Sequence, residues 1–290
     1  MMQKRLFKYF NLFLYIALFS ALVFVVRAIG RQTVATNDCA LDKMECCIVN
    51  VGDGNCAVLK CGSKTIMIDI GPSESKEHVK DILEQMDVTA IDCLIISHPH
   101  SDHYGGFKAL KDIPVKIVYI SPQESEKSYY AECLEFFSQR GASPIQTPVG
   151  EFIEIGEIKL FFLGPLEQNK SVNDMSLVIR AVYKDISVLF PADMSGEEAR
   201  QIIDSGCVLS SEVFICAHHG SNADGANSYV LLREVMPEYV IISGAGSQSM
   251  YGYPHEEVLS RLRDLGCEVY RTDLFGDISF YTYGEKIYFN

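Results

Sequence analysis

Three histidines and an aspartate lie within six residues of this chain, directly after an apolar run. The segment "IISHPHSDHYGG" covers residues 95–106 and contains His98, His100, Asp102 and His103. His98 and His100 are two residues apart, so in an extended segment both side chains project to one side. A turn after them can bring Asp102 and His103 back beside them. Because imidazole and carboxylate groups are ligands of zinc, manganese and iron, the segment predicts a metal-binding loop. A His-rich surface loop is the alternative, but the chain has only seven histidines.

Further metal-affine side chains follow other apolar runs. Asp193 ends "VLFPAD" just before a helix, where its carboxylate can bridge two metals or, alternatively, cap the helix at Ser195. His218 and His219 end "ICAHHGS", and either one can bind metal or be a hydrogen-bonded core histidine. His255 in "YGYPHEEVL" begins a helix, as a ligand, a proton donor or a simple cap. We therefore expect the metal site where these strands end.

The order of elements predicts strands first, and then strands that alternate with helices. Short apolar runs between Gly, Pro or Asn turns indicate strands, and apolar residues at helical spacing indicate helices. Ser195, with Glu198 three residues on, is typical of a capping box. This order permits mixed sheets with helices outside, a four-layer α/β sandwich. We predict strands over 45–51, 57–61, 65–71, 91–97, 115–120, 151–155, 157–163, 176–183, 186–190, 212–217, 239–243 and up to 289, with helices over 75–88, 128–142, from 195, 227–236 and 256–265.

The first 31 residues differ in composition from the remainder. Three basic residues precede an apolar run over 9–26, and two follow it. At roughly 18 residues the run is long enough to cross a bilayer as a helix. We predict an uncleaved transmembrane anchor in 1–31, with the bulk of the chain outside the cell because positive charge is heavier before the run. A cleaved signal segment, giving a secreted protein, and a buried core helix are the alternatives. Residues 32–43 are predicted to be a linker and 44–290 a single folded domain.

Composition limits the possible partners. The net charge of −13 argues against broad electrostatic binding of nucleic acid or anionic lipid by the whole surface, and leaves a local basic or metal-lined groove open. Cys93 and Cys216 lie in apolar runs and are predicted to be buried thiols. The five cysteines from 39 to 61 include no CxxC pair, which argues against a zinc knuckle, and one or two disulfides there stay open.

These motifs together resemble the metallo-β-lactamase superfamily, whose hallmark is HxHxDH. The resemblance covers about residues 44–290, and more narrowly it is to the hydrolase domain associated with the ComEC/Rec2 competence proteins. It implies an α/β fold, a four-layer αββα sandwich, here preceded by the predicted membrane helix. The supporting segments are, in order, "VNVGDGNCAVLKCGSKTIMIDIG", "SHPHSDHYGG", "NDMSLVIR", "LFPAD", "AHHGS", "YGYPHEEVLSRL" and "YRTDLFGDISFY".

The resemblance implies two divalent metal ions, zinc or manganese, and a set of site residues. It places His98 and His100 on one metal, Asp102 and His103 on the other, and Asp193 between them. It leaves three candidates, His218, His219 and His255, for completing the ligation or protonating the leaving group, with their roles undecided. We take His218 as the sixth metal ligand, Asp102, His218 and His219 as catalytic residues, and Asn173, Ser176 and His255 as substrate-binding residues.

Two departures from the family pattern bear on the first metal. The superfamily often has a histidine between the hallmark and the bridging Asp, whereas this chain has none from 104 to 217. Asn173 and Asp174 stand in that stretch, so the first site is expected to be weaker or less selective for zinc. The relatives also tend to read "GQGD" where this chain reads "GDGN", so Asp53 and Asn55 can exchange roles near the site.

The resemblance implies a phosphodiesterase or nuclease that uses a metal-bound hydroxide and acts on DNA or another phosphodiester. A hydrolase of a small ester, lactone, thioester or lactam is the alternative, and binding without turnover is a third. A nuclease should show a basic or aromatic groove, for which Lys108, Lys111, Lys116 and Lys170 are candidates unless they are ordinary solvated lysines. A small-molecule hydrolase should show a closed apolar pocket. The oligomeric state is not predicted.

Overall fold

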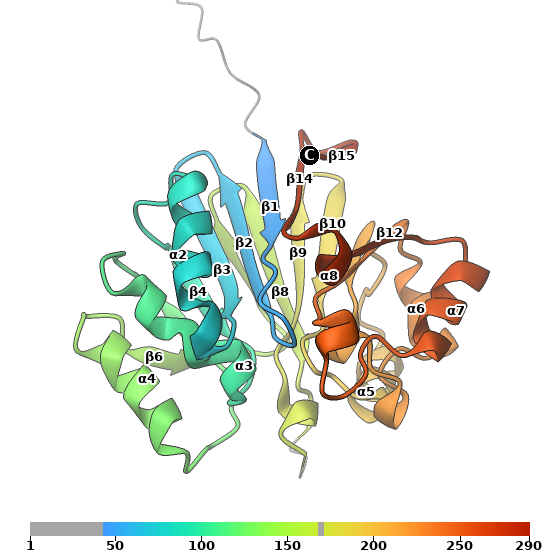
Figure 1. Cartoon of the computed structure of the whole chain (residues 1–290), viewed down its shortest axis with the longest axis horizontal. Coiled ribbons are helices and arrows are strands. Elements are labelled where there is room, and N and C mark those ends of the chain that lie inside the picture. The colour runs from blue at the N-terminus through green and yellow to red at the C-terminus, as the bar shows by residue number, and fades with distance from the viewer. Residues whose placement is uncertain (1–42, 168–170) are drawn as a thin grey trace, which may run out of the picture. The chain divides into compact units, whose positions relative to one another are not determined.

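Two β-sheets pack against each other and carry helices on their outer sides (Figure 1). The computed structural model describes residues 43–167 and 171–290, and Lys43–Asn290 form one compact unit. One sheet has eight strands in the order β15-β14-β1-β2-β3-β4-β5-β6, and the other has seven in the order β13-β12-β11-β10-β9-β8-β7. The chain is thus an α/β sandwich built on two sheets.

The bounds of the elements follow. The strands are β1 Met44–Ile48, β2 Cys56–Cys61, β3 Lys64–Ile70, β4 Cys93–Ile96, β5 Val118–Ile120, β6 Pro144–Gln146, β7 Phe152–Ile155, β8 Ile158–Gly164, β9 Val178–Tyr183, β10 Ile186–Phe190, β11 Val213–Ile215, β12 Tyr239–Ile242, β13 Glu268–Arg271, β14 Ile278–Thr282 and β15 Ile287–Phe289. The α-helices are α2 Lys76–Gln85, α3 Ser101–Tyr104, α4 Ser128–Ser138, α5 Gly196–Asp204, α6 Tyr229–Val235, α7 Glu256–Asp264 and α8 Thr272–Phe275. The 3-10 helices are η1 Ser73–Ser75, η2 Gly105–Leu110, η3 Asn173–Met175, η4 Ala217–Gly220, η5 Ala223–Gly225 and η6 Gly246–Gln248.

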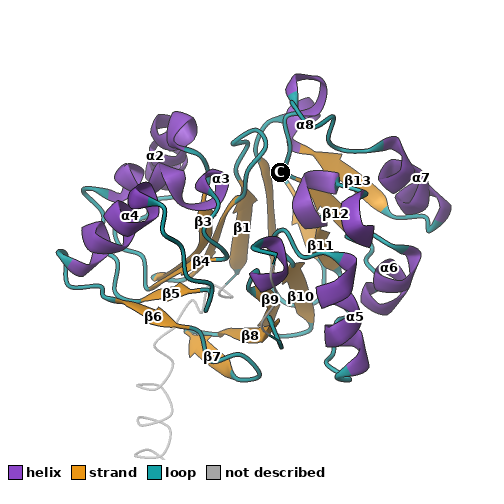
Figure 2. Cartoon of the chain, turned by 90° about the horizontal axis from the view of Figure 1, so that it is seen from below, coloured by secondary structure: helices purple, strands orange, loops and turns teal. Residues whose placement is uncertain are grey.

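The strands have two apolar faces because both sheets are covered on both sides. In β1, Met44, Cys46 and Ile48 pack in the core between the sheets, and Cys47 packs in a second core under α2 and α4. Side chains alternate along a strand, so β1 supplies both of these cores. A third core lies under α5, α6 and α7. Figure 2 shows α2 and α4 beside one sheet and α5, α6 and α7 beside the other.

Parallel strand pairing brings the predicted site residues to one edge. β3, β4 and β5 are parallel neighbours in one sheet, and β10, β11 and β12 are parallel neighbours in the other. The loops that carry function leave the carboxyl ends of such strands. His98 follows β4, Asp193 follows β10, and His218 follows β11. The fold therefore explains why residues far apart in sequence meet.

Most predicted elements are confirmed, and the differences are local. The helix expected over 128–142 ends at Ser138, and the chain turns at Gly141 with φ +86°, three residues later. The short strand β6 was missed. Ser195 does cap α5, accepting from the amide of Glu197, but the capping box with Glu198 is wrong because the Glu198 side chain is fully buried and forms no hydrogen bond.

Two predictions concern the N-terminal segment and the cysteines. The predicted anchor in 1–31 and the linker 32–43, apart from Lys43, lie outside the described residues. None of the helices in the described part of the chain has the length and apolarity that a membrane span requires. Cys93 and Cys216 are buried thiols as predicted, and burial raises the pKa of Cys93 to about 12. No disulfide joins the cysteines of the described ranges.

Candidate metal centre

The HxHxDH segment turns sharply after β4 and brings its donors together. The amide of His100 donates to the carbonyl of His98 (3.0 Å), and the amide of His103 donates to the carbonyl of His100 (3.0 Å). His98 Nε2 then lies 3.0 Å from His100 Nδ1. His98 and His103 are fully buried, whereas Asp102 is only partly so. The predicted turn that folds Asp102 and His103 back is present as α3.

Asp193 lies between two groups of donors and presents one carboxylate oxygen to each. Its Oδ2 lies 3.6 Å from His98 Nε2. Its Oδ1 lies 3.3 Å from His103 Nε2 and 3.6 Å from His219 Nε2. The side chain is buried, and the cap of α5 is Ser195 instead. The alternative role for Asp193, capping the helix, is therefore wrong.

The adjacent residues His218 and His219 point to different places. Both have left-handed backbone conformations, with φ of +50° and +56°. His219 Nε2 lies 3.5 Å from Asp102 Oδ2, and its Nδ1 lies 3.2 Å from the carbonyl of Ser243. His218 Nε2 lies 3.7 Å from Asp193 Oδ2 and 3.5 Å from the Tyr253 hydroxyl. The left-handed turn thus sends only His219 in beside Asp102.

Two sets of atoms can hold a metal ion. Asp102, His103, Asp193 and His219 form one set, and His98, His100 and Asp193 form the other, with the ligand atoms in each set within 4.8 Å of one another. The structure thus groups His219, and not the predicted His218, with the metal ligands. A ligand role for His218 stays a prediction.

The first set fits a divalent metal by a test that does not depend on resemblance. His103 Nε2, His219 Nε2 and Asp193 Oδ1 are buried and have no hydrogen-bond partner. Buried polar atoms without a partner are rare, and each costs about 1–3 kcal/mol. Four ligands placed tetrahedrally at ~2.0–2.2 Å from zinc lie about 3.3–3.6 Å from one another. The four nitrogen–oxygen distances in the set fall in this range. His103 Nε2 lies 3.3 Å from Asp193 Oδ1 and 3.5 Å from Asp102 Oδ2, and His219 Nε2 lies 3.6 Å and 3.5 Å from the same two oxygens. A cation at their centre would satisfy all of them.

Asp69 is a functional residue that the sequence reading missed. It is the last residue but one of β3, has a left-handed conformation (φ +57°) and is 1% exposed. Its Oδ2 lies 2.7 Å from His103 Nδ1, and it also accepts hydrogen bonds from the amide and hydroxyl of Ser97 (both 2.7 Å). This contact fixes the ring of His103 and leaves Nε2 for the metal. A lone carboxylate inside the apolar strand "TIMIDI" was the available signal.

Charges within the site are strongly coupled. Burial lowers the pKa of His98 well below its ordinary value. For His103 burial also opposes the charged form, but Asp193, Asp69 and Asp102 outweigh it and raise the pKa. Burial would raise the pKa of Asp193, yet His103 and His219 lower it overall. Protons on these histidines and metal cations therefore compete for the same carboxylates.

Four of the donors, His100, Asp102, Asp193 and His219, line a cavity of about 320 Å³. Asn173 lines it as predicted, and Lys127 is the one Lys or Arg side chain among its described lining residues. Asp53 also lines the cavity, whereas Asn55 does not. The Asp53 carboxylate accepts a hydrogen bond from the amide of Ala245 (2.9 Å). The full lining is Asp53, His100, Ser101, Asp102, Lys127, Asn173, Asp193, His218, His219, Tyr251 and Tyr253.

Two predicted substrate-binding residues do not line this cavity. Ser176 is fully buried. His255 stands at the N-terminus of α7, where its Nδ1 accepts from the amide of Asn222 (2.8 Å) and holds the loop after η4. Substrate contact by either residue stays a prediction without support from the cavity lining.

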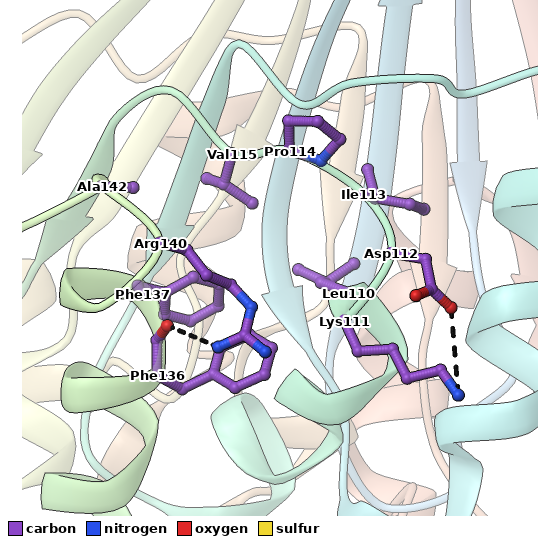
Figure 3. Close-up of a pocket in the computed structure, with 10 residues that line it drawn as sticks. All are labelled: Leu110, Lys111, Asp112, Ile113, Pro114, Val115, Phe136, Phe137, Arg140 and Ala142. Atoms are coloured by element: carbon purple, nitrogen blue, oxygen red, sulfur yellow. Dashed lines mark hydrogen bonds and ion pairs between the residues drawn. The ribbon is translucent and has the colours of Figure 1, made fainter.

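Three of the four lysines that the sequence offered for a basic groove do not line this cavity. Lys108 pairs with Glu132 (2.8 Å) and Lys116 pairs with Asp92 (2.6 Å). Lys111 lines a separate cavity of about 270 Å³ between η2 and α4, which contains Phe136 and Arg140 but no histidine (Figure 3). Lys170 lies outside the described residues. The ordinary, solvated reading therefore fits Lys108 and Lys116.

Comparison with known proteins gives the same family as the geometry. Residues 49–244 match the family model described as the metallo-beta-lactamase superfamily. Competence protein ComA of Neisseria gonorrhoeae is 29% identical over 234 residues, which are 80% of this chain and 31% of that protein. ComE operon protein 3 of Bacillus subtilis is 23% identical over 274 residues, which are 86% of this chain and 34% of that protein. The chain thus spans about a third of the length of these curated relatives.

A solved structure supports the fold. The metallo-beta-lactamase fold protein YhfI from Bacillus subtilis superposes with a TM-score of 0.56 at 11% identity, covering 85% of this chain and 100% of that one. At that identity the likeness concerns the fold alone. With the family match over more than half of its length, and with candidate metal ligands at the expected strand ends, this chain belongs to the metallo-beta-lactamase superfamily.

Proposed function

We propose that this metallohydrolase is a phosphodiesterase that cleaves nucleic acid. The observation that carries the proposal is the position of Asp193, which belongs to two ligand sets and lines the cavity. Two divalent ions bound there would lower the pKa of a water molecule and neutralise charge on substrate oxygens. The names of the two curated relatives, both competence proteins or products of a competence operon, favour nucleic acid over other esters.

The charges of the cavity explain why cations would be needed for a phosphodiester. Asp53, Asp102 and Asp193 line it, whereas Lys127 is the only basic side chain in its described lining apart from histidine. Without cations, three carboxylates repel a phosphate. With them, the sign of the local field is reversed, and the Lys127 ammonium adds to the attraction. This is how a chain with a net charge of −13 can still bind an anionic substrate.

His218 and Tyr253 are proposed to move the proton to the leaving oxygen. They line the cavity but lie outside both ligand sets, and His218 Nε2 is 3.5 Å from the Tyr253 hydroxyl. Burial lowers the pKa of His218, so its imidazole is neutral at neutral pH. A neutral imidazole with a hydroxyl beside it can pass a proton without binding metal. Asn173, on the cavity wall, is proposed to orient the substrate.

A small-molecule ester, lactone, thioester or lactam hydrolase is the second candidate. One observation favours it, namely that a single lysine lines a cavity of about 320 Å³, which is near the lower end for small-ligand pockets. The cavity is polar and not the closed apolar pocket expected for this alternative.

The test measures hydrolysis of single-stranded and duplex oligonucleotides by the full chain, with Mn²⁺ or Zn²⁺ supplied. His100→Ala and Asp193→Asn are the active-site variants, and His78→Ala, a half-exposed histidine outside both ligand sets, is the matched control. Metal-dependent cleavage lost in the first two variants and kept in the control supports the proposal. A protein that holds two metals and cleaves small esters or lactones but no oligonucleotide contradicts it.

The N-terminal anchor over 9–26 is part of the same proposal. It would hold the catalytic domain outside the cytoplasmic membrane, where extracellular nucleic acid is the available substrate. Protease accessibility of the domain in intact cells and in spheroplasts tests this orientation. Release of the protein from membranes by high salt alone would contradict an anchor.

A further inference from the structure

A row of aromatic rings leads from the metal ligands to the surface. The rings of His219 and Tyr253 are 6.2 Å apart between centroids, and those of Tyr253 and Tyr251 are 5.5 Å apart with planes inclined by only 23°. Tyr253 is 8% exposed, whereas Tyr251 is 65% exposed. Both line the same cavity as Asp193. The outermost ring is therefore presented to solvent at the mouth of the site.

Two hydrogen bonds hold the backbone segment that carries this ring. Ser249 Oγ accepts from the amides of Tyr251 (3.2 Å) and Tyr253 (3.1 Å), which clamps the segment between η6 and α7. Gly252 between the two tyrosines has φ +73°, a conformation that lets both rings face the same way. Among the described residues, Tyr253 is the one ring in contact with Tyr251. An aromatic ring with so much exposed surface, on a backbone held by these hydrogen bonds, is suited to stack on another flat group.

The cavity thus offers three features that match one nucleotide unit. The two ligand sets around Asp193 would carry cations for the phosphate. Lys127, which also lines the cavity, supplies an ammonium for an unesterified phosphate oxygen. Tyr251 supplies a face for a planar ring. Phosphate contacts are insensitive to the base, whereas stacking on an aromatic side chain requires a base that is not already stacked within a duplex.

We propose that Tyr251, backed by Tyr253, is a stacking subsite for a nucleobase next to the cleaved phosphodiester. It makes the enzyme prefer single-stranded nucleic acid, or strand ends, to the interior of a duplex. This inference rests on the proposed phosphodiesterase function and adds the form of substrate that it takes. Since every base has a π-face, the subsite would not select a sequence.

The test compares two single-stranded oligonucleotides, one with all its bases and one with a single abasic unit moved stepwise along the strand. The full chain is assayed as wild type, Tyr251→Ala and Tyr251→Phe, with Tyr283→Ala as the matched control, because Tyr283 is 44% exposed and does not line the cavity. KM and kcat are measured for each pair, and the product ends locate the cleavage.

We expect Tyr251→Ala to raise KM for the complete strand by about 5- to 100-fold with little change in kcat. Tyr251→Phe and Tyr283→Ala should behave as wild type. For wild type, one position of the abasic unit beside the cut should raise KM by a similar factor, and Tyr251→Ala should lose that dependence on position.

Other outcomes separate the two claims. If wild type cleaves strands but Tyr251→Ala has an unchanged KM, or weakens the abasic and complete strands equally, the stacking subsite is overturned while the proposed function stands. If wild type loaded with metal cleaves no nucleic acid, the proposed function fails and the subsite fails with it.

Discussion

His103 Nδ1 lies 2.7 Å from Asp69 Oδ2, and both side chains are buried. The contact joins the end of β3 to the HxHxDH turn, and it leaves His103 Nε2 without a partner, facing Asp193 Oδ1 at 3.3 Å. Asp69 therefore determines which nitrogen of His103 is available to a metal. It is a positioning residue, because it acts through His103 and does not line the cavity.

Replacing Asp69 by Asn should weaken metal binding although no ligand is lost. The side-chain amide of the new asparagine lacks the negative charge that makes His103 more basic. We therefore expect a 10- to 100-fold lower affinity for the metal held by the set that contains His103. Competition with a chromophoric chelator measures this affinity. Asp277→Asn is the control, because Asp277 pairs with His78 at 2.8 Å outside both ligand sets. Equal affinity of Asp69→Asn and wild type would show that the contact has no such role.

His218 and His219 should differ in what their loss removes. His219→Ala deletes a member of the four-ligand set, so metal content should fall by about one ion per chain. His218→Ala should keep its metal and lose about 10²–10⁴-fold in kcat, the usual size of a general acid–base contribution. Elemental analysis beside initial rates separates the two, with His78→Ala as a common control. Loss of metal from His218→Ala would make it a ligand after all.

Some residues of the site could be predicted from the sequence, and others could not. The four donors of the HxHxDH segment could be predicted from sequence, because they lie within six residues and a single turn brings them together. Which of His218 and His219 joins the metal ligands depends on two successive left-handed backbone conformations, and the sequence "AHHGS" does not predict these conformations. Asp69 and Tyr251 join the site through strand pairing and a long loop, so their roles required the fold. The strands and helices of the sandwich were predictable, because apolar periodicity is a property of each element by itself, and their order and the family resemblance implied the layers.

Metal affinity should rise with pH. Asp193, Asp69 and Asp102 overcome burial and raise the pKa of His103, and Asp193 together with Asp102 raises that of His219. Below these raised pKa values both rings carry protons that a metal must displace. The affinity should therefore increase about tenfold per pH unit for each proton released, and level off above the raised pKa values. Chelator competition at a series of pH values between 5 and 9 measures the slope. A flat profile would mean that these histidines do not ligate.

Glu198 should make the fold less stable as pH rises. Burial raises its pKa well above 4.5, and Asp174 adds to the effect. Between 4.5 and the folded pKa the unfolded chain ionises and the folded chain does not, so the free energy of unfolding falls with increasing pH. The variant Glu198→Gln cannot ionise at this position, so its free energy of unfolding should not fall in this way. The difference in free energy of unfolding between Glu198→Gln and wild type should therefore increase by more than about 1 kcal/mol from pH 5 to pH 8, which corresponds to ~2–4 °C in Tm.

Urea unfolding at the two pH values tests this, with apo protein to keep metal binding out of the comparison. The matched control is Glu197→Gln, because Glu197 is the exposed neighbour that pairs with Arg200. Equal pH dependence in Glu198→Gln and wild type would indicate that Glu198 is ionised in the folded chain.

The central claim is that Asp193 is shared by two metal sites. Anomalous diffraction from crystals of the full chain grown with Mn²⁺ or Zn²⁺ tests it most directly. We predict two peaks about 3.5–4 Å apart, one beside His98 and His100 and one beside Asp102, His103 and His219, with Asp193 contacting both. A single peak, or two peaks of which only one contacts Asp193, would contradict the account.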